Sequence, residues 1–349
     1  MRIALISYPM LFQKKGGLQI QVQETLTALC ALGVDAKIFD TLNDKLEDFD
    51  ILHVFGLANG NESIIKVAKE LGLKVVLSPL ARCSWTKARA QIAKISDRIV
   101  GKLTHWHVKS DYAMCNDAYT LSDYVIFLGE QEYLSATSAF NVDQTAFTIV
   151  ANGINQRYFQ TNGDAYREKY ASNLSVPLIL VVGSINQNKN QLALVEAMKD
   201  FPCQIHIIGP CVSSEQKNLD HMVSYQHVKY IGYLDNNDPM LASAYAAADL
   251  FCLPSYQEVL PLTVFEALAA GTPVAATNNS AIEFAEDARA YAEFSPQSQQ
   301  DIRSVVINSL QQSMSKEACK MLVADKSWQA VAEQLMAVYN TVNNDNSTE

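Results

Sequence analysis

Short apolar runs rich in β-branched residues alternate with segments of helical periodicity, and this alternation constrains the fold more than any other feature. Arg2–Ser7 is predicted to be a strand, and Leu18–Leu32 after it has apolar residues at helical spacing. Gly33 then stands where a left-handed helix cap is common. Near-continuous apolar strands separated by helices are typical of a parallel sheet covered on both faces. The sequence therefore predicts a doubly wound α/β architecture.

The alternation breaks off around Asn152-Gly153 and then starts again. The strands predicted on the two sides of this break are Val34–Phe39, Ile51–Phe55, Val75–Leu77 and Tyr124–Phe127, then Leu178–Val182, Gln204–Ile208, Val228–Ile231, Leu250–Leu253 and Pro273–Ala276. We expect two Rossmann-like domains, over residues 1–155 and 156–327. An amphipathic helix is expected over 328–342, followed by a polar tail over 343–349. Ligands of such sheets bind beyond the carboxyl ends of the strands, so we expect a cleft between the domains to hold the site.

Composition excludes several classes of protein. The net charge of −10 argues against nucleic-acid binding through an overall basic surface. The seven cysteines are scattered and odd in number, which argues against a disulfide framework and favours reduced cytosolic thiols. They include no CxxC pair, which argues against a structural zinc site. The opening letters MRIALISYP become polar too soon for a signal peptide, and no apolar run approaches the roughly 20 residues that span a bilayer. We expect a cytoplasmic protein that at most rests on the inner face of the cell membrane.

The strongest chemical signal is the segment PSYQEVLPLTVFEALAAGTPVAAT, which begins at Pro254. A buried strand ends here in a loop that contains Glu258, and Pro261 suits the first turn of the helix that follows. Free backbone N–H groups and the positive end of the helix dipole make this turn a candidate anion site. Glu266 lies about one turn inside the helix, within reach of a hydroxylated ligand group beside the anion. Each acid, taken alone, also fits an ordinary loop or helix position.

This segment resembles the E-x7-E signature of retaining nucleotide-sugar glycosyltransferases of family 4, which have the GT-B fold. The resemblance covers most of the chain, in order and at matching spacing. Its other pieces are Gly16-Gly17, DILHVFG from Asp50, VANGIN from Val150, LILVVGSINQNKNQ from Leu178, IHIIG from Ile205, VKYIGYL from Val228 and YAAADLFCLPS from Tyr245.

The resemblance implies transfer of a sugar from a nucleoside-diphosphate sugar, of UDP or GDP type, with retention of the anomeric configuration. The acceptor would be a glycan or a lipid-linked molecule in cell-surface polysaccharide or lipopolysaccharide assembly. The family is generally metal-independent and needs no further cofactor, so protein groups must neutralise the leaving diphosphate. The family's terminal helix packs back on the N-terminal domain, although a helix that caps the C-terminal domain would show the same sequence pattern.

The resemblance also assigns site residues. Lys189 would bind the diphosphate, and Glu258 would approach the donor sugar. Glu266 would hydrogen-bond the ribose hydroxyls. The remaining donor-site candidates are Gly16 and Gly17, whose lack of side chains permits close backbone approach, Ser184, Tyr233 in the base-selecting loop, and the backbone of Val259, Leu262 and Thr263. Lys189 alone would also fit an exposed lysine at a helix start, and the glycine pair a flexible turn.

Two positions depart from the family pattern. Ser184 stands where the family often has an arginine, and no histidine follows Val75–Leu77. Arg82, Lys87 and Arg89 are candidates to replace the missing cation. His53 is a strand-end histidine, a type that is more often structural than catalytic. Because of these departures, a catalytically impaired GT-B subunit that supports a partner transferase stays open as an alternative, as does a GT-B sugar-nucleotide epimerase.

A basic segment stands out in this acidic chain. Its cations are Arg82, Lys87, Arg89, Lys94, Arg98 and Lys102, and its one acid is Asp97. Ile92, Ile95 and Ile99 follow helical spacing within it. The segment is a candidate patch for an acceptor or an anionic membrane. The alternative is a surface helix that packs its apolar stripe on the domain and leaves its lysines in solvent.

Overall fold

The computed structural model describes residues 1–13, 16–57, 59–81, 85–104, 109–170, 175–284, 288–312 and 314–344. The chain divides into one unit of Met1–Gly153 with Trp328–Glu349 and a second unit of Ile154–Ser327. The division between the units lies two residues before the expected one. Among the described helices, none is both long and apolar enough to cross a membrane.

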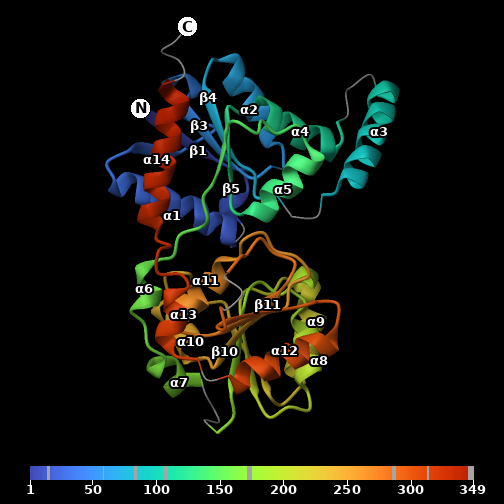
Figure 1. Cartoon of the computed structure of the whole chain (residues 1–349), viewed down its shortest axis with the longest axis vertical. Helices are drawn as coiled ribbons and strands as arrows, with labels where there is room; N and C mark the ends of the chain where they lie inside the picture. The colour runs from blue at the N-terminus through green and yellow to red at the C-terminus, as the bar shows by residue number, and fades with distance from the viewer. Residues whose placement is uncertain are drawn as a thin grey trace. The chain divides into compact units, whose positions relative to one another are not determined.

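The N-terminal unit is built on a six-stranded parallel sheet (Figure 1). Its strands are β1 (Arg2–Ile6), β2 (Asp35–Ile38), β3 (Ile51–Phe55), β4 (Lys74–Ser78), β5 (Tyr124–Phe127) and β6 (Phe147–Ile149). They run in the order β2-β1-β3-β4-β5-β6. The helices are α1 (Gly17–Ala31), α2 (Asn61–Glu70), α3 (Lys87–Leu103), α4 (Asp111–Leu121), α5 (Glu130–Ala139) and α14 (Trp328–Asn344), with short 3-10 turns at Leu11–Gln13 and Leu46–Asp48.

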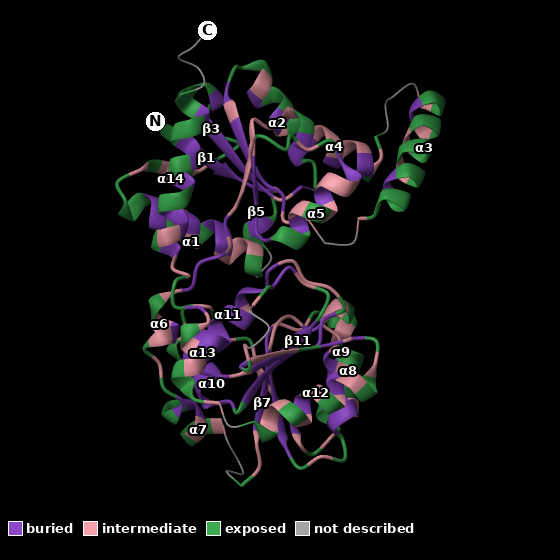
Figure 2. Cartoon of the chain, in the orientation of Figure 1, coloured by how far each residue is buried: buried purple, intermediate pink, exposed green. Residues whose placement is uncertain are grey.

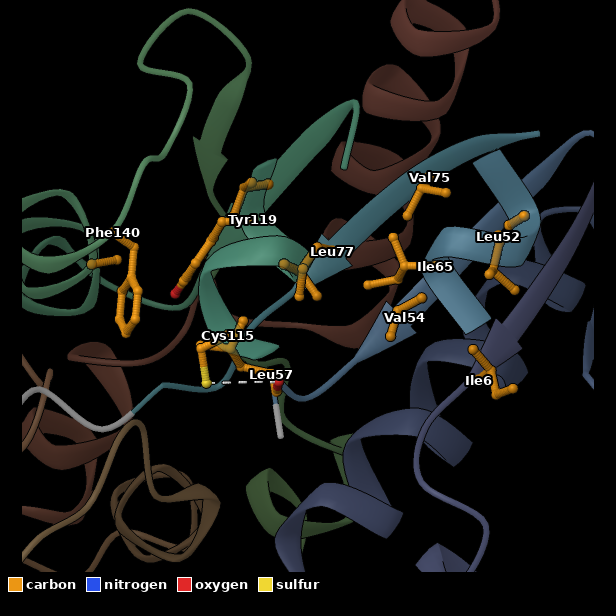
Figure 3. Close-up of a cluster of buried hydrophobic side chains, with 14 of the residues drawn as sticks. Ile6, Leu52, Val54, Leu57, Ile65, Val75, Leu77, Cys115, Tyr119 and Phe140 are labelled. Carbon is orange, nitrogen blue, oxygen red and sulfur yellow. Dashed lines mark hydrogen bonds between the residues drawn. The ribbon is translucent and has the colours of Figure 1, made fainter. Parts of the chain in front are cut away.

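Helices cover both faces of this sheet. Alternate strand residues point to opposite sides, so the apolar side chains on each face need a layer of their own. On one face Leu52 and Val54 lie beside Ile65 of α2, and the same cluster extends past Leu77 to Tyr119 of α4, as Figure 3 shows. On the other face α14 packs against α1 and β4. The sheet core is therefore closed by the last helix of the chain as well as by the first.

The C-terminal unit repeats this architecture (Figure 2). Its parallel strands are β7 (Leu178–Val182), β8 (Gln204–Ile208), β9 (Val228–Gly232), β10 (Leu250–Leu253), β11 (Val274–Thr277) and β12 (Tyr291–Phe294). The order is β12-β11-β10-β7-β8-β9. The helices are α6 (Gln156–Phe159), α7 (Asp164–Tyr170), α8 (Gln191–Met198), α9 (Gln216–Val223), α10 (Pro239–Ala247), α11 (Leu262–Ala269), α12 (Gln299–Gln311) and α13 (Lys316–Met321), with 3-10 turns at Gln187–Lys189 and Ser213–Glu215.

The predicted fold class, two Rossmann-like α/β domains with parallel sheets, is confirmed. The strands absent from the prediction are β6 and β12, which lie at sheet edges. β6 is half-buried throughout, and of β12 only Phe294 is buried. Neither strand therefore carries the continuous apolar run by which the central strands were recognised.

Candidate functional site

The order of strands in the C-terminal sheet creates a topological switch point between β7 and β10. These strands are neighbours, but the chain leaves β7 toward β8 on one side and β10 toward β11 on the other. The loops after the two strands therefore diverge at the carboxyl edge of the sheet, which is where ligands of open α/β sheets bind. Lys189 lies in the connection after β7, and Glu258 lies in the connection after β10.

The structure brings these two predicted residues into direct contact. Lys189 Nζ lies 2.6 Å from Glu258 Oε1, and the two side chains are 21% and 15% exposed. A charge-assisted hydrogen bond of this length is among the stronger contacts in proteins. The C-terminal unit thus presents a cation and a carboxylate, partly sheltered from water, at its switch point.

Asparagine side chains hold the two loops in place. Asn186 Oδ1 accepts a hydrogen bond from Lys189 N at 3.0 Å, and Asn188 Nδ2 donates to Gln257 O at 3.0 Å. Asn190 Nδ2 donates to Pro254 O at 3.1 Å. On the other side of the loop, Asn279 O accepts from Glu258 N at 2.9 Å. Sequence reasoning missed these positioning residues, although the run INQNKNQ is the kind of asparagine-rich stretch that forms side-chain-to-backbone turns.

A close approach of two strand ends also shapes the site. Gly209 has φ +151°, and a Cβ on it would lie 2.0 Å from Gly183 O. Gly183 has φ +157°, and a Cβ on it would meet Cε of Lys189 at 3.4 Å. The Lys189 side chain therefore lies against Gly183 at the end of β7, and glycine at 209 permits the end of β8 to approach the same residue.

The first turn of α11 faces the same loop. Pro261 is the residue just before α11 rather than its first residue, one position from the prediction. Thr263 Oγ1 and the fully buried Ser255 Oγ have no hydrogen-bond partner among the described residues. Leu262 is buried, and Val259 O accepts from Ala281 N at 2.7 Å. The turn therefore combines backbone N–H groups, which a helix start leaves without intrahelical acceptors, with the unpaired hydroxyl of Thr263, and the loop before it contains the unpaired hydroxyl of Ser255.

Glu266 is buried within the C-terminal unit and has protein partners. Tyr245 Oη donates to Glu266 Oε2 at 2.8 Å. Burial, followed by the Glu266 charge, raises the pKa of Tyr158 well above its ordinary value. The guanidinium of Arg157 lies 4.8 Å from the centre of the Tyr158 ring. The carboxylate thus accepts a hydrogen bond from a phenol of α10, while the Tyr158 hydroxyl of α6 donates to Asn236 Oδ1 at 3.2 Å.

The other predicted donor-site residues are spread over three places. Ser184 Oγ follows β7 and accepts from Asn186 Nδ2 at 2.8 Å, so an uncharged group stands at this position. Tyr233 is 38% exposed and donates to Asp235 Oδ2 at 3.1 Å. Gly16 and Gly17 belong to the N-terminal unit at the start of α1, and a Cβ on either would meet nothing within 4 Å. The fold itself does not require glycine at these two positions.

The predicted basic patch lies on α3, and the face by which this helix packs on its domain is not the one that the alternative reading of the sequence implied. Arg82 lies outside the described residues, whereas Lys87, Arg89 and Lys94 are exposed on α3. The alternative, in which the apolar stripe of this helix packs on the domain, is wrong: Ile92, Ile95 and Ile99 are 69%, 59% and 55% exposed. α3 packs through its small residues instead, with Ala90 and Gly101 buried.

His53 has a structural environment. It is fully buried on β3, with Nδ1 2.6 Å from Tyr339 Oη of α14 and Nε2 2.9 Å from Ser78 Oγ. Burial lowers its pKa to about 3, so the ring is neutral. Within the described part of the chain, no group of three or more His, Cys, Asp or Glu side chains is arranged to hold a metal ion.

Residues 162–317 match the family model described as glycosyl transferases group 1. The chain is 28% identical over 163 residues to O-antigen chain mannosyltransferase B of Escherichia coli, covering 44% of this chain and 38% of that protein. It is 22% identical over 290 residues to the processive diacylglycerol alpha-glucosyltransferase of Acholeplasma laidlawii, covering 78% of each. The first of these matches thus spans well under half of the relative.

Solved structures share the fold over the full length. Sucrose-phosphate synthase (tll1590) from Thermosynechococcus elongatus superposes with a TM-score of 0.76 at 19% identity, covering 98% of each chain. Anabaena Alr3699/HepE in complex with UDP superposes with a TM-score of 0.72 at 13% identity, covering 98% of this chain and 100% of that one. The architecture is that of GT-B glycosyltransferases.

Proposed function

Because residues 162–317 match a glycosyltransferase family and form a GT-B type domain, we propose that this chain is a retaining glycosyltransferase. It would move a sugar from a UDP- or GDP-type nucleotide sugar to a glycan or lipid-linked acceptor. The observation that carries the proposal is the Lys189–Glu258 pair at the switch point between β7 and β10. The matched segment contains both residues, and each lies on a loop that the fold directs toward a ligand.

Charge neutralisation of the leaving diphosphate is assigned to protein groups rather than to a bound metal. Lys189 would turn from Glu258 to the diphosphate, which carries more negative charge than a single carboxylate. The first turn of α11 would add backbone N–H groups, and the hydroxyls of Thr263 and Ser255 would gain the acceptor that they lack within the protein. Such donors are fixed before the reaction, so they stabilise developing charge without reorganisation.

The transfer step follows from retention of configuration. The acceptor hydroxyl would attack the anomeric carbon on the face from which the diphosphate leaves. The bond between that carbon and the diphosphate oxygen breaks with its electron pair going to the phosphate, and the same phosphate oxygen takes the proton of the acceptor hydroxyl. Glu258, released by Lys189, would hydrogen-bond the hydroxyls of the donor sugar. No histidine base is needed in this scheme, in keeping with the structural environment of His53.

The names of the relatives support a cell-surface role. One is a mannosyltransferase of the O-antigen chain, and another is a glucosyltransferase of diacylglycerol. The first name denotes transfer to a polysaccharide chain and the second denotes transfer to a lipid. We therefore place this chain in cell-surface polysaccharide or lipopolysaccharide assembly on the cytoplasmic side of the membrane.

A nucleotide screen followed by product analysis tests the proposal. UDP or GDP, at 100 times its dissociation constant, should add about 2.7 kcal/mol to the free energy of unfolding. The matching nucleotide sugar should then give a product with cell-envelope acceptors, with the anomeric configuration of the donor. Glu258→Gln should lower the transfer rate by about 100-fold or more, whereas Glu317→Gln on the exposed surface of α13 should leave it unchanged. Stabilisation by no nucleoside diphosphate would refute the proposal.

Ser184 favours one second candidate. It leaves an uncharged hydroxyl at a position where a second cation would assist diphosphate departure. A protein that binds nucleotide sugar but forms no product, even with membranes added, would be an impaired subunit that supports a partner transferase. In that case the variant Ser184→Arg should form detectable product. A changed sugar nucleotide without any acceptor would instead identify an epimerase.

A further inference from the structure

The helix α3 exposes an apolar stripe where a domain surface would ordinarily be polar. Ile92, Ile95, Ile99 and Leu103 are 69%, 59%, 55% and 77% exposed. With 3.6 residues per turn, these four side chains fall within an arc of about 80° on an ideal helix. They form a continuous stripe along α3, named here the isoleucine stripe. A stripe of this kind on the surface of a globular unit indicates an interaction site.

The helix is packed on its domain by the opposite face. Ala90 and Gly101 are buried, and Ala93 packs against the core of the N-terminal unit. Asp97 accepts hydrogen bonds from the backbone N and Oγ of Ser110 at 3.2 and 2.8 Å. α3 rests on α4 and α5 through these contacts. Figure 2 shows most of the remaining surface of α3 as exposed. The isoleucine stripe therefore points away from the core of the N-terminal unit.

The charge on α3 indicates what covers the stripe. The helix has five basic residues and a single acid, in a chain with a net charge of −10. The acid is Asp97, whose carboxylate is engaged by Ser110. On an ideal helix Lys87, Arg98 and Lys102 border one side of the isoleucine stripe and Arg89 borders the other. All of them are exposed. Two copies of so basic a face would repel each other, which argues against self-association through the stripe.

We infer that α3 docks the chain on an anionic lipid bilayer, with the isoleucine stripe in the interface and the flanking lysines and arginines on the headgroups. An apolar face bordered by basic side chains is the pattern of helices that lie in the membrane plane. Anionic lipid attracts the cations, while insertion of the apolar side chains holds the helix in place. The inference uses none of the contacts that support the proposed nucleotide site, so its test is independent of the proposed function.

Vesicle partitioning of the full chain tests this inference. We expect co-sedimentation with vesicles of phosphatidylcholine mixed with phosphatidylglycerol, weak binding to phosphatidylcholine alone, and loss of binding as salt is raised. Ile95→Ser with Ile99→Ser should lower the partition coefficient by about tenfold or more. Met321→Ser, which removes a 77% exposed apolar side chain from α13, is the matched control and should not change partitioning. Arg98→Gln with Lys102→Gln should weaken binding to the anionic vesicles.

The stripe and charge variants alter exposed side chains, so their thermal stability and nucleotide-induced stabilisation should equal those of the parent. This readout separates membrane docking from the nucleotide site. The inference is overturned if the parent does not bind anionic vesicles, if it binds neutral vesicles equally well, or if the serine double variant binds as well as the parent. A dimer that dissociates on Ile95→Ser with Ile99→Ser would also overturn it and identify a second copy as the occupant.

Discussion

Lys189 and Glu258 form the smallest unit on which the proposed chemistry depends. Without ligand, each satisfies the charge of the other at 2.6 Å, in a setting partly shielded from water. A diphosphate must draw Lys189 away from Glu258, and this frees the carboxylate beside the donor sugar. One contact would therefore couple diphosphate binding to the availability of the acid.

The variant Lys189→Met should have two effects. It removes a charged hydrogen bond to the diphosphate, worth about 1.5–3 kcal/mol, so affinity for the nucleoside diphosphate should fall by about 10- to 100-fold. It also leaves Glu258 unpaired, so the ligand-free protein should lose stability. Adding Glu258→Gln should recover that stability without recovering affinity, as measured by calorimetric titration and thermal unfolding.

Lys199→Met on the exposed end of α8 is the matched control and should leave both quantities unchanged. Equal nucleotide affinity in the parent and Lys189→Met would contradict the assignment of the diphosphate to this lysine.

His53 makes acid stability a second prediction at the residue scale. Its folded pKa of about 3 lies below the ordinary 6.5, so the native ring stays neutral while the unfolded ring takes up a proton. Stability should therefore fall as pH drops from about 6.5 toward 3, by about 2 kcal/mol from this residue at pH 5. His206, whose pKa burial lowers to about 4, acts in the same direction.

Chemical denaturation at pH 7 and pH 5 would measure this effect. His53→Gln should start less stable but lose less on acidification than the parent, whereas the exposed His221→Gln should match the parent at both pH values. An equal acid loss in the parent and His53→Gln would show that His53 is not the group responsible.

Sequence reasoning reached the residues that bear charge but not those that position them. Lys189 and Glu258 were found because their types and spacing resemble a known pattern. The positioning roles of Asn188 and Asn279 were not predicted, because a side-chain amide that bridges two loops leaves no periodic pattern in the sequence. The contact between Tyr245 and Glu266 was not predicted either. In the sequence Tyr245 resembles an ordinary core residue, and the contact is evident only when α10 and α11 are packed together.

At the scale of elements, the meeting of β7 and β8 depends on Gly209. Gly209→Ala would place a methyl group 2.0 Å from Gly183 O at φ +151°, so the strand ends must separate. We expect a loss of at least about 1–3 kcal/mol in the free energy of unfolding, together with weaker nucleotide binding.

Gly17→Ala is the informative counterpart, because its added methyl group meets nothing within 4 Å. Its stability should stay within about 0.5 kcal/mol of the parent, while nucleotide affinity should fall if the backbone approaches the ligand there. Denaturant titration checks both variants. A Gly209→Ala protein as stable as Gly17→Ala would contradict the close-packed strand ends.

The two strands missed by prediction are partly buried edge strands, although the other two edge strands, β2 and β9, were predicted despite being partly buried. The central strands are buried on both faces, so their apolar runs are continuous. The edge strands β6 and β12 are only partly buried and lack such runs. For α3 the periodicity was recognised, but the sequence could not indicate which way the apolar face points. That depends on Ala90 and Gly101, small residues that no hydrophobic pattern marks.

At the scale of the whole molecule, the chain leaves the N-terminal unit at Gly153 and returns to it at Trp328. The returning helix α14 is linked to the sheet by the hydrogen bond between Tyr339 Oη and Nδ1 of His53 on β3. Tyr339→Phe should leave a buried imidazole nitrogen unpaired and cost about 1–3 kcal/mol. Hydrogen exchange should show faster opening of β1, β3, β4 and α14, with β7 to β10 unaffected. Equal acceleration in both units would contradict the division of the chain.

The most direct test of the central claim is hydrogen exchange of the full chain with and without the nucleoside diphosphate that stabilises it. The account predicts slower exchange in residues 183–190 and 254–266, the two loops at the switch point and the start of α11. It predicts no such protection in Lys189→Met at the same nucleotide concentration. Protection confined to other segments, or none in these loops at saturating nucleotide, would contradict the account.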